Sequence, residues 1–85
     1  MIDYARLRGW EFIYHTWNSI HSPPGFPDLI LLKEGRLVVA ELKVGKNNLT
    51  AEQYFWLVEF SWNTDDVYVW WDTDEDWKEI TEVLK

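Results

Sequence analysis

The sequence predicts a small α/β domain, a mixed β-sheet with flanking helices in the order α-β-β-β-α-β-α. Short apolar runs rich in β-branched and aromatic residues, bounded by Gly, Pro and Asn, indicate the strands. Two later stretches change to helical spacing behind capping signals. The chain of 85 residues contains no repeat or linker, so residues 1–85 are expected to form a single domain.

The first elements are a helix, a strand and a loop. "IDYARLR" at 2–8 is followed by Gly9 and is expected to be a short helix with a glycine stop. "WEFIYHTW" at 10–17 is aromatic and β-branched, which is typical of a strand. "NSIHSPPGFP" at 18–27 contains adjacent prolines that exclude regular structure, so it is expected to be a loop.

Two strands and their connection follow. "DLILL" at 28–32 and "RLVVAELKV" at 36–44 are joined by "KEGR", in which Glu34-Gly35 resembles a tight hairpin turn. "GKNN" at 45–48 predicts a second turn.

The last part of the chain alternates helix, strand and helix. Residues 49–62 have helical spacing, and Thr50 followed by Gln53 matches the capping-box pattern. "VYVWW" at 67–71 is a further strand, and 72–85 ends the chain as an amphipathic helix.

Composition limits the class of protein. Seven Trp, four Tyr and four Phe give a short chain much apolar area to bury. The absence of Cys excludes disulfides and thiolate metal sites and suits a reducing compartment. We find no apolar stretch of signal-peptide or membrane-span length, and we expect a soluble, cytoplasmic protein.

The net charge of −7 is unevenly distributed. Residues 1–49 carry six Lys and Arg against five acids, whereas residues 50–85 carry ten acids against two lysines. Much of the later acid lies in "NTDD" and "DTDED", where turns and helix starts favour Asp and Glu. The acidic total therefore argues only weakly against a nucleic-acid partner.

Acidic residues interrupt both central strands. A two-residue or a four-residue loop at the predicted turn places Asp28 opposite Glu41 in either case, with Lys43 on the same face. Facing side chains of this kind have Cβ atoms roughly 4.5–5.5 Å apart. Two such carboxylates repel each other unless a divalent cation lies between them, and oxygen ligands suit Mg²⁺ or Mn²⁺. The alternative is a solvated hairpin face whose acids are partly paired with Lys43.

These residues carry a resemblance to a known family. Pro27-Asp28 followed by Glu41-Leu42-Lys43 resembles the PD-(D/E)xK nuclease signature. "GFPDLILL", "LVVAELKVGKNNLTAEQYFWL", "VYVWW" and a terminal helix with "DW" are similar to its VRR-Nuc subgroup over nearly the whole chain. The resemblance implies a restriction-endonuclease-like core and Mg²⁺- or Mn²⁺-dependent hydrolysis of DNA, often branched or Holliday-junction DNA. It also implies a homodimer from a bacterial or phage-infected cell.

The same resemblance assigns roles to individual residues. Asp28 and Glu41 would be metal ligands, with the backbone carbonyl of Leu42 as a third. Lys43 would be the catalytic lysine. Gln53 matches the glutamine that begins the following helix at the edge of the active site, although a capping role alone would explain it.

Several further residues are weaker candidates. Family members have a longer first helix that supplies an acid to the metal site, whereas here Asp3 is the only acid in the first helix, and its role stays open. His15 follows aromatic residues on the first strand and could approach the site or be structural. Lys46, His21 and Arg36 are candidate DNA contacts, with ordinary surface positions as the alternative.

Two other classes of function remain. A nucleic-acid-binding module with the same fold but without catalysis would bind DNA in a salt-dependent manner and cleave nothing. A protein-interaction module is compatible with the acidic second half and with its aromatic residues. Of these, Trp56 and Trp62 are not both expected to face inward, which would leave one for a dimer interface.

Overall fold

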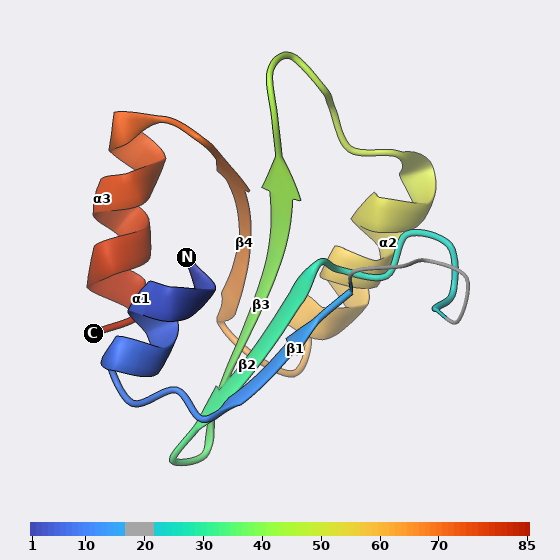
Figure 1. Ribbon diagram of the computed structural model, residues 1–85. Helices are drawn as coiled ribbons and strands as arrows, with labels where there is room; N and C mark the ends of the chain where they lie inside the picture. The colour runs from blue at the N-terminus through green and yellow to red at the C-terminus, as the bar shows by residue number, and fades with distance from the viewer. Residues whose placement is uncertain (17–21) are drawn as a thin grey trace.

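The computed structural model describes residues 1–16 and 22–85, and it confirms the predicted order of elements. The elements are α1 (Ile2–Leu7), β1 (Phe12–His15), β2 (Leu29–Lys33), β3 (Arg36–Lys43), α2 (Ala51–Ser61), β4 (Asp66–Trp71) and α3 (Asp74–Val83), as Figure 1 shows. The four strands form one sheet in the order β1-β2-β3-β4. The β1–β2 and β2–β3 pairs are antiparallel and the β3–β4 pair is parallel, so the sheet is mixed, as predicted.

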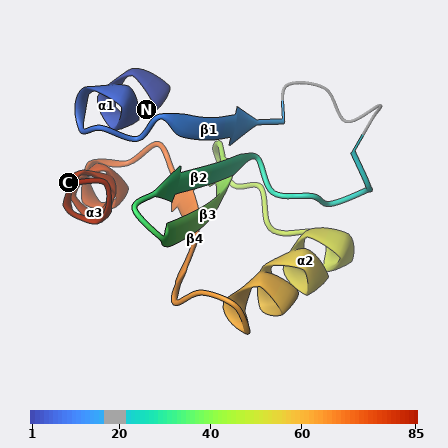
Figure 2. The ribbon, with the colours of Figure 1, turned by 90° about the horizontal axis from the view of Figure 1, so that it is seen from below.

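The helices cover the sheet unequally. Helices α1 and α3 lie together on one side of it, and α2 lies on the other side (Figure 1, Figure 2). The main core fills the space between the sheet and the α1–α3 pair. Its fully buried members are Ala5, Trp10, Leu29, Leu31, Val38, Ala40, Trp70, Ile80 and Leu84.

The β2–β3 connection is the tight hairpin that the sequence predicts. Glu34 and Gly35 both have positive φ, 50° and 81°, and Lys33 pairs directly with Arg36. Two successive positive φ angles are typical of the hairpin turn whose twist matches that of the flanking strands. The loop therefore has two residues, and the register of the two central strands is fixed from this end.

Strand β1 is shorter than the predicted strand at 10–17. Trp10 lies outside it, is fully buried, and donates its indole N–H to the carbonyl of Leu84 at 3.0 Å. The cationic groups of Lys33 and Arg36 lie 5.5 and 5.4 Å from the centre of the Trp10 ring. Trp10 thus closes the core beneath the end of α3 rather than extending the sheet.

The loop before β2 packs tightly against α2. Gly25 has φ +82°, and a Cβ atom there would lie 2.5 Å from the carbonyl carbon of Glu52. The ring of Phe26 lies 5.1 Å from that of Trp56, whose indole N–H donates to the carbonyl of Pro24 at 3.1 Å. The close approach that glycine permits therefore sets the position of the first turn of α2.

The longest helix in the described part of the chain, α2, has 11 residues. Crossing a bilayer takes about 20 apolar residues in a helix. None of the helices in residues 1–16 and 22–85 is long and apolar enough to do so.

Candidate active site

Asp28 lies directly before β2 and is held by backbone on two sides. Its Oδ2 accepts a hydrogen bond from the N–H of Leu42 at 2.8 Å. The N–H of Thr16 donates to the carbonyl of Asp28 at 2.8 Å, and the Thr16 hydroxyl donates to the carbonyl of Pro27 at 3.0 Å. The N–H of Leu42 on β3 therefore orients the carboxylate, and Thr16, directly after β1, fixes the backbone that carries it.

Glu41 lies beside Asp28, as the strand register predicts. Glu41 is only 3% exposed, and its Oε2 is buried without a hydrogen-bond partner among the described residues. Burial, followed by a hydrogen bond to Asp28 and the charge of Asp28, raises the pKa of Glu41 to about 8, and the charge of Lys43 opposes this rise. Burial and the neighbouring Asp28 thus both disfavour the ionised form of Glu41.

Lys43 is tied to the start of α2. Its Nζ donates to Oε1 of Gln53 at 2.7 Å. The same oxygen accepts the N–H of Thr50 at 2.9 Å, while the Thr50 hydroxyl accepts the N–H of Gln53 at 3.2 Å. These bonds form the predicted capping box. Gln53 therefore caps the helix and holds the lysine with one and the same oxygen.

The carboxylate pair fits a hard divalent cation. A buried carboxylate oxygen without a partner is destabilising, and a cation that binds it removes that penalty. Ligands that are all oxygen suit Mg²⁺ or Mn²⁺. Residues 1–16 and 22–85 contain no group of three or more His, Cys, Asp or Glu placed to hold a metal ion. Asp28 and Glu41 thus remain the two acidic candidate ligands for a metal ion, and the Leu42 carbonyl stays a predicted third ligand.

The open question about Asp3 has a geometric answer. Asp3, Arg6 and His15 line a cavity of about 510 Å³ between α1 and the sheet. Neither Asp3 nor His15 joins Asp28 and Glu41 in a metal-binding group of the described residues. Among the described residues, the first helix therefore brings no acid into a shared metal-binding group with Asp28 and Glu41.

The three candidate DNA contacts differ in their distance from the carboxylate pair and in their ion pairing. Lys46 is exposed in the turn just after β3 and takes part in neither ion pair of the described residues. Arg36 begins β3, about 23 Å of strand away from Lys43, and its Nε lies 2.9 Å from Oδ2 of Asp66. His21 lies outside the described residues. Of the two that the structure describes, Lys46 is the one that lies within a few residues of Lys43, at the site's end of β3.

Thr16 is a site residue that the sequence does not reveal. The sequence places it within the strand predicted at 10–17 and assigns it no individual role. Its contact with Asp28 depends on the register of β1 against β2, which pairs His15 with Leu29. The long loop between these strands carries no turn signal that would fix this register.

Comparison of the chain with protein families, with curated proteins and with solved structures found no match.

Proposed function

We propose that this protein is a metal-dependent endodeoxyribonuclease of the VRR-Nuc type with a restriction-endonuclease-like core. It hydrolyses phosphodiester bonds with Mg²⁺ or Mn²⁺, preferentially in branched or Holliday-junction DNA. The observation that carries the proposal is the buried Oε2 of Glu41, which lacks a hydrogen-bond partner among the described residues and lies beside Asp28.

The two acids differ in burial and in hydrogen bonding. Asp28 is fixed by the N–H of Leu42 and stays partly accessible, whereas Glu41 is almost fully buried. Without a cation, the buried carboxyl keeps a proton or pays several kcal/mol to ionise. With a cation, both carboxylates ionise and hold it. A purely structural pair of strands would be more stable with an apolar residue at position 41.

Lys43 supplies the positive charge next to the cation. When bound, the metal ion would polarise a phosphoryl oxygen and lower the pKa of a coordinated water. The ammonium of Lys43 has three N–H donors, and Gln53 accepts one of them. The remaining two are available to the negative charge that develops on the phosphate in the transition state. Gln53 thus acts as a positioning residue.

The proposed assembly is a homodimer acting in a bacterial or phage-infected cytoplasm. A domain of this size has little surface with which to hold a duplex, and a symmetric dimer would present two sites. Strand β1 is an edge strand, and its side chains Phe12 and Tyr14 are 69% and 51% exposed. Exposed apolar residues on a sheet edge favour pairing with a second copy.

Cleavage of a labelled four-way junction in Mg²⁺ or Mn²⁺ tests the proposal. Lys43→Ala and Asp28→Asn are expected to lower the rate by about 10²-fold or more. Asn keeps an acceptor for the N–H of Leu42 and removes only the charge, so the fold is retained. Lys46→Ala is the matched control because it removes a nearby lysine and leaves the Lys43–Gln53 bond intact. Equal cleavage by the wild type and all three variants would overturn the proposal.

A DNA-binding module without catalysis is the second candidate. It is favoured by one observation, the absence of a third acidic group at the site within the described residues. Salt-dependent binding of the junction without cleavage in any divalent ion would select it.

A further inference from the structure

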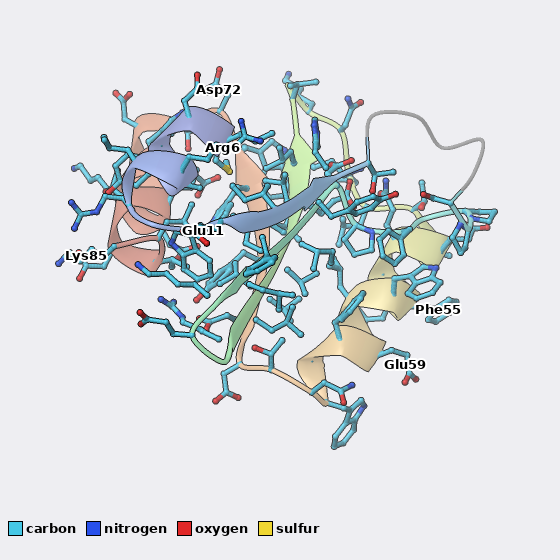
Figure 3. The ribbon with its side chains drawn as sticks, turned by 60° about the horizontal axis from the view of Figure 1, so that its bottom comes forward. Arg6, Glu11, Phe55, Glu59, Asp72 and Lys85 are labelled. Atoms are coloured by element: carbon cyan, nitrogen blue, oxygen red, sulfur yellow. The ribbon has the colours of Figure 1, made fainter. Side chains whose placement is uncertain are left out.

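The side of α2 that faces away from the sheet is unusually apolar for an exposed surface. We call this side the α2 outer face. It is formed by residues at helical spacing, namely Glu52, Phe55, Trp56, Glu59 and Trp62. Phe55 is 63% exposed and Trp62 is 82% exposed. Figure 3 shows Phe55 and Glu59 projecting from α2 away from the rest of the protein. The opposite side of the same helix buries Leu57 against the sheet. The loop at Pro24 and Phe26 covers part of Trp56. Exposed apolar area remains at Phe55 and Trp62, and an apolar patch of this kind indicates a missing partner.

The α2 outer face is also hollowed. A cavity of about 290 Å³ is lined by Pro24, Glu52, Phe55, Trp56 and Glu59. A second cavity of about 200 Å³ shares Trp56 and Glu59 with the first. Together they form a groove along the helix, which is about 16 Å long. Its lining includes the aromatic side chains Phe55 and Trp56 and the acidic side chains Glu52 and Glu59.

The charged residues that line this groove are acidic. They are Glu52 and Glu59, and no Lys or Arg lines either cavity. The two ion pairs among the described residues involve other side chains, so neither Glu52 nor Glu59 is neutralised by one. A ligand that fills the groove therefore meets an uncompensated negative potential.

We propose that the α2 outer face binds a cationic amphipathic segment of a partner protein. Apolar side chains of that segment fill the groove against Phe55 and Trp56, and its Lys or Arg side chains contact Glu52 and Glu59. Exposed tryptophan and phenylalanine are typical anchors of such interfaces, and they also attract cations through their ring faces.

The same charges disfavour two other occupants. Nucleic acid would bring phosphates against Glu52 and Glu59 in a groove whose lining contains no Lys or Arg. A second copy packed antiparallel across a two-fold axis near Phe55 would place Glu52 of one copy close to Glu59 of the other, and like charges in contact are destabilising. The inference is independent of the proposed nuclease activity, because none of the residues of the α2 outer face belongs to the Asp28–Glu41–Lys43 cluster.

The probe is a fluorescein-labelled amphipathic helix of about 14 residues, Leu and Lys in helical spacing, titrated by anisotropy without DNA or divalent metal. We expect saturable binding that Glu52→Lys/Glu59→Lys weakens at least about tenfold. Phe55→Ser is expected to weaken it by a similar factor, since it removes a wall of the groove. Glu11→Lys/Glu75→Lys has the same net charge but alters exposed acids elsewhere, and it should stay within about threefold of the wild type. Circular dichroism confirms that each variant is folded.

Three results would overturn the proposal. One is equal weakening by both charge-reversal variants, which would mean attraction by net charge alone. Another is equal binding of a peptide in which Glu replaces Lys. The third is self-association of the wild type in sedimentation equilibrium that Phe55→Ser abolishes, which would make a second copy the occupant. Amide chemical-shift changes confined to α2 and the loop around Pro24 would support it.

Discussion

Replacing Glu41 by Gln isolates the energetic consequence of the buried carboxyl pair. The pKa of Glu41 is raised from 4.5 to about 8, chiefly by burial and then by Asp28. Between these two values the folded protein holds a proton that the unfolded chain has released. The free energy of unfolding therefore falls as pH rises through this window, by up to about 1.4 kcal/mol per pH unit. Across the whole window the loss is at most about 5 kcal/mol, comparable to the total stability of a small domain.

Glutamine has nearly the shape of the protonated acid and cannot ionise. Glu41→Gln should therefore match the wild type at pH 5 and exceed its free energy of unfolding by several kcal/mol at pH 8.5, when divalent ions are absent. Urea unfolding across this pH range in EDTA measures the difference, with Glu75→Gln as the exposed control. A difference between Glu41→Gln and the wild type that stays constant from pH 5 to 8.5 would mean that Glu41 does not titrate in this range.

The metal should reverse the order of stability. At pH 8, Mn²⁺ at one hundred times its dissociation constant is expected to stabilise the wild type by about 2.7 kcal/mol, because it binds only the folded protein. Glu41→Gln lacks one carboxylate ligand and should gain far less. Equal stabilisation of both proteins would place the bound ion elsewhere.

Three further substitutions test the elements that position the site. In a urea titration, Gly25→Ala should lower the free energy of unfolding by about 1–3 kcal/mol more than Gly35→Ala does. Both glycines have positive φ, but only Gly25 lies against the backbone of α2. Equal losses would mean that the contact between Gly25 and α2 does not contribute to stability. Thr16→Val should cost about 1 kcal/mol and weaken Mn²⁺ binding in calorimetry, because it removes the hydroxyl bond to Pro27; unchanged Mn²⁺ affinity would mean that Thr16 does not position Asp28. Gln53→Ala should lower the free energy of unfolding by about 1 kcal/mol and should also lower kcat. Gln53→Glu should restore the helix cap and shift the pH–rate profile, because it places a new charge next to Lys43. A loss of stability with unchanged kcat would mean that Gln53 acts only as a helix cap.

The features that the sequence predicts correctly are those set by local chemistry. Glu34-Gly35 fixes a two-residue turn, and that turn alone determines that Asp28 and Glu41 meet. Likewise, Thr50 and Gln53 fix the start of α2 because a capping box needs only four consecutive residues. In both cases the information lies within a few positions of the chain.

The features that the sequence does not predict depend on contacts between distant segments. Trp10 looks like a strand residue, but its indole N–H binds the last turn of the chain and its ring closes the core. Gly25 reads as one loop residue among several, although its role is to admit the backbone of α2. The burial of Glu41 also depends on the α2 side of the sheet, whose packing no single segment specifies.

The proposed activity depends on Asp28 and Glu41 binding one divalent cation together. Crystals soaked in Mn²⁺ and measured at the manganese absorption edge test it most directly. We expect one anomalous peak within about 2.0–2.3 Å of a carboxylate oxygen of each residue, and we expect this peak to be lost in Glu41→Gln. Manganese found only among the acids of residues 72–76, with none between Asp28 and Glu41, would contradict it.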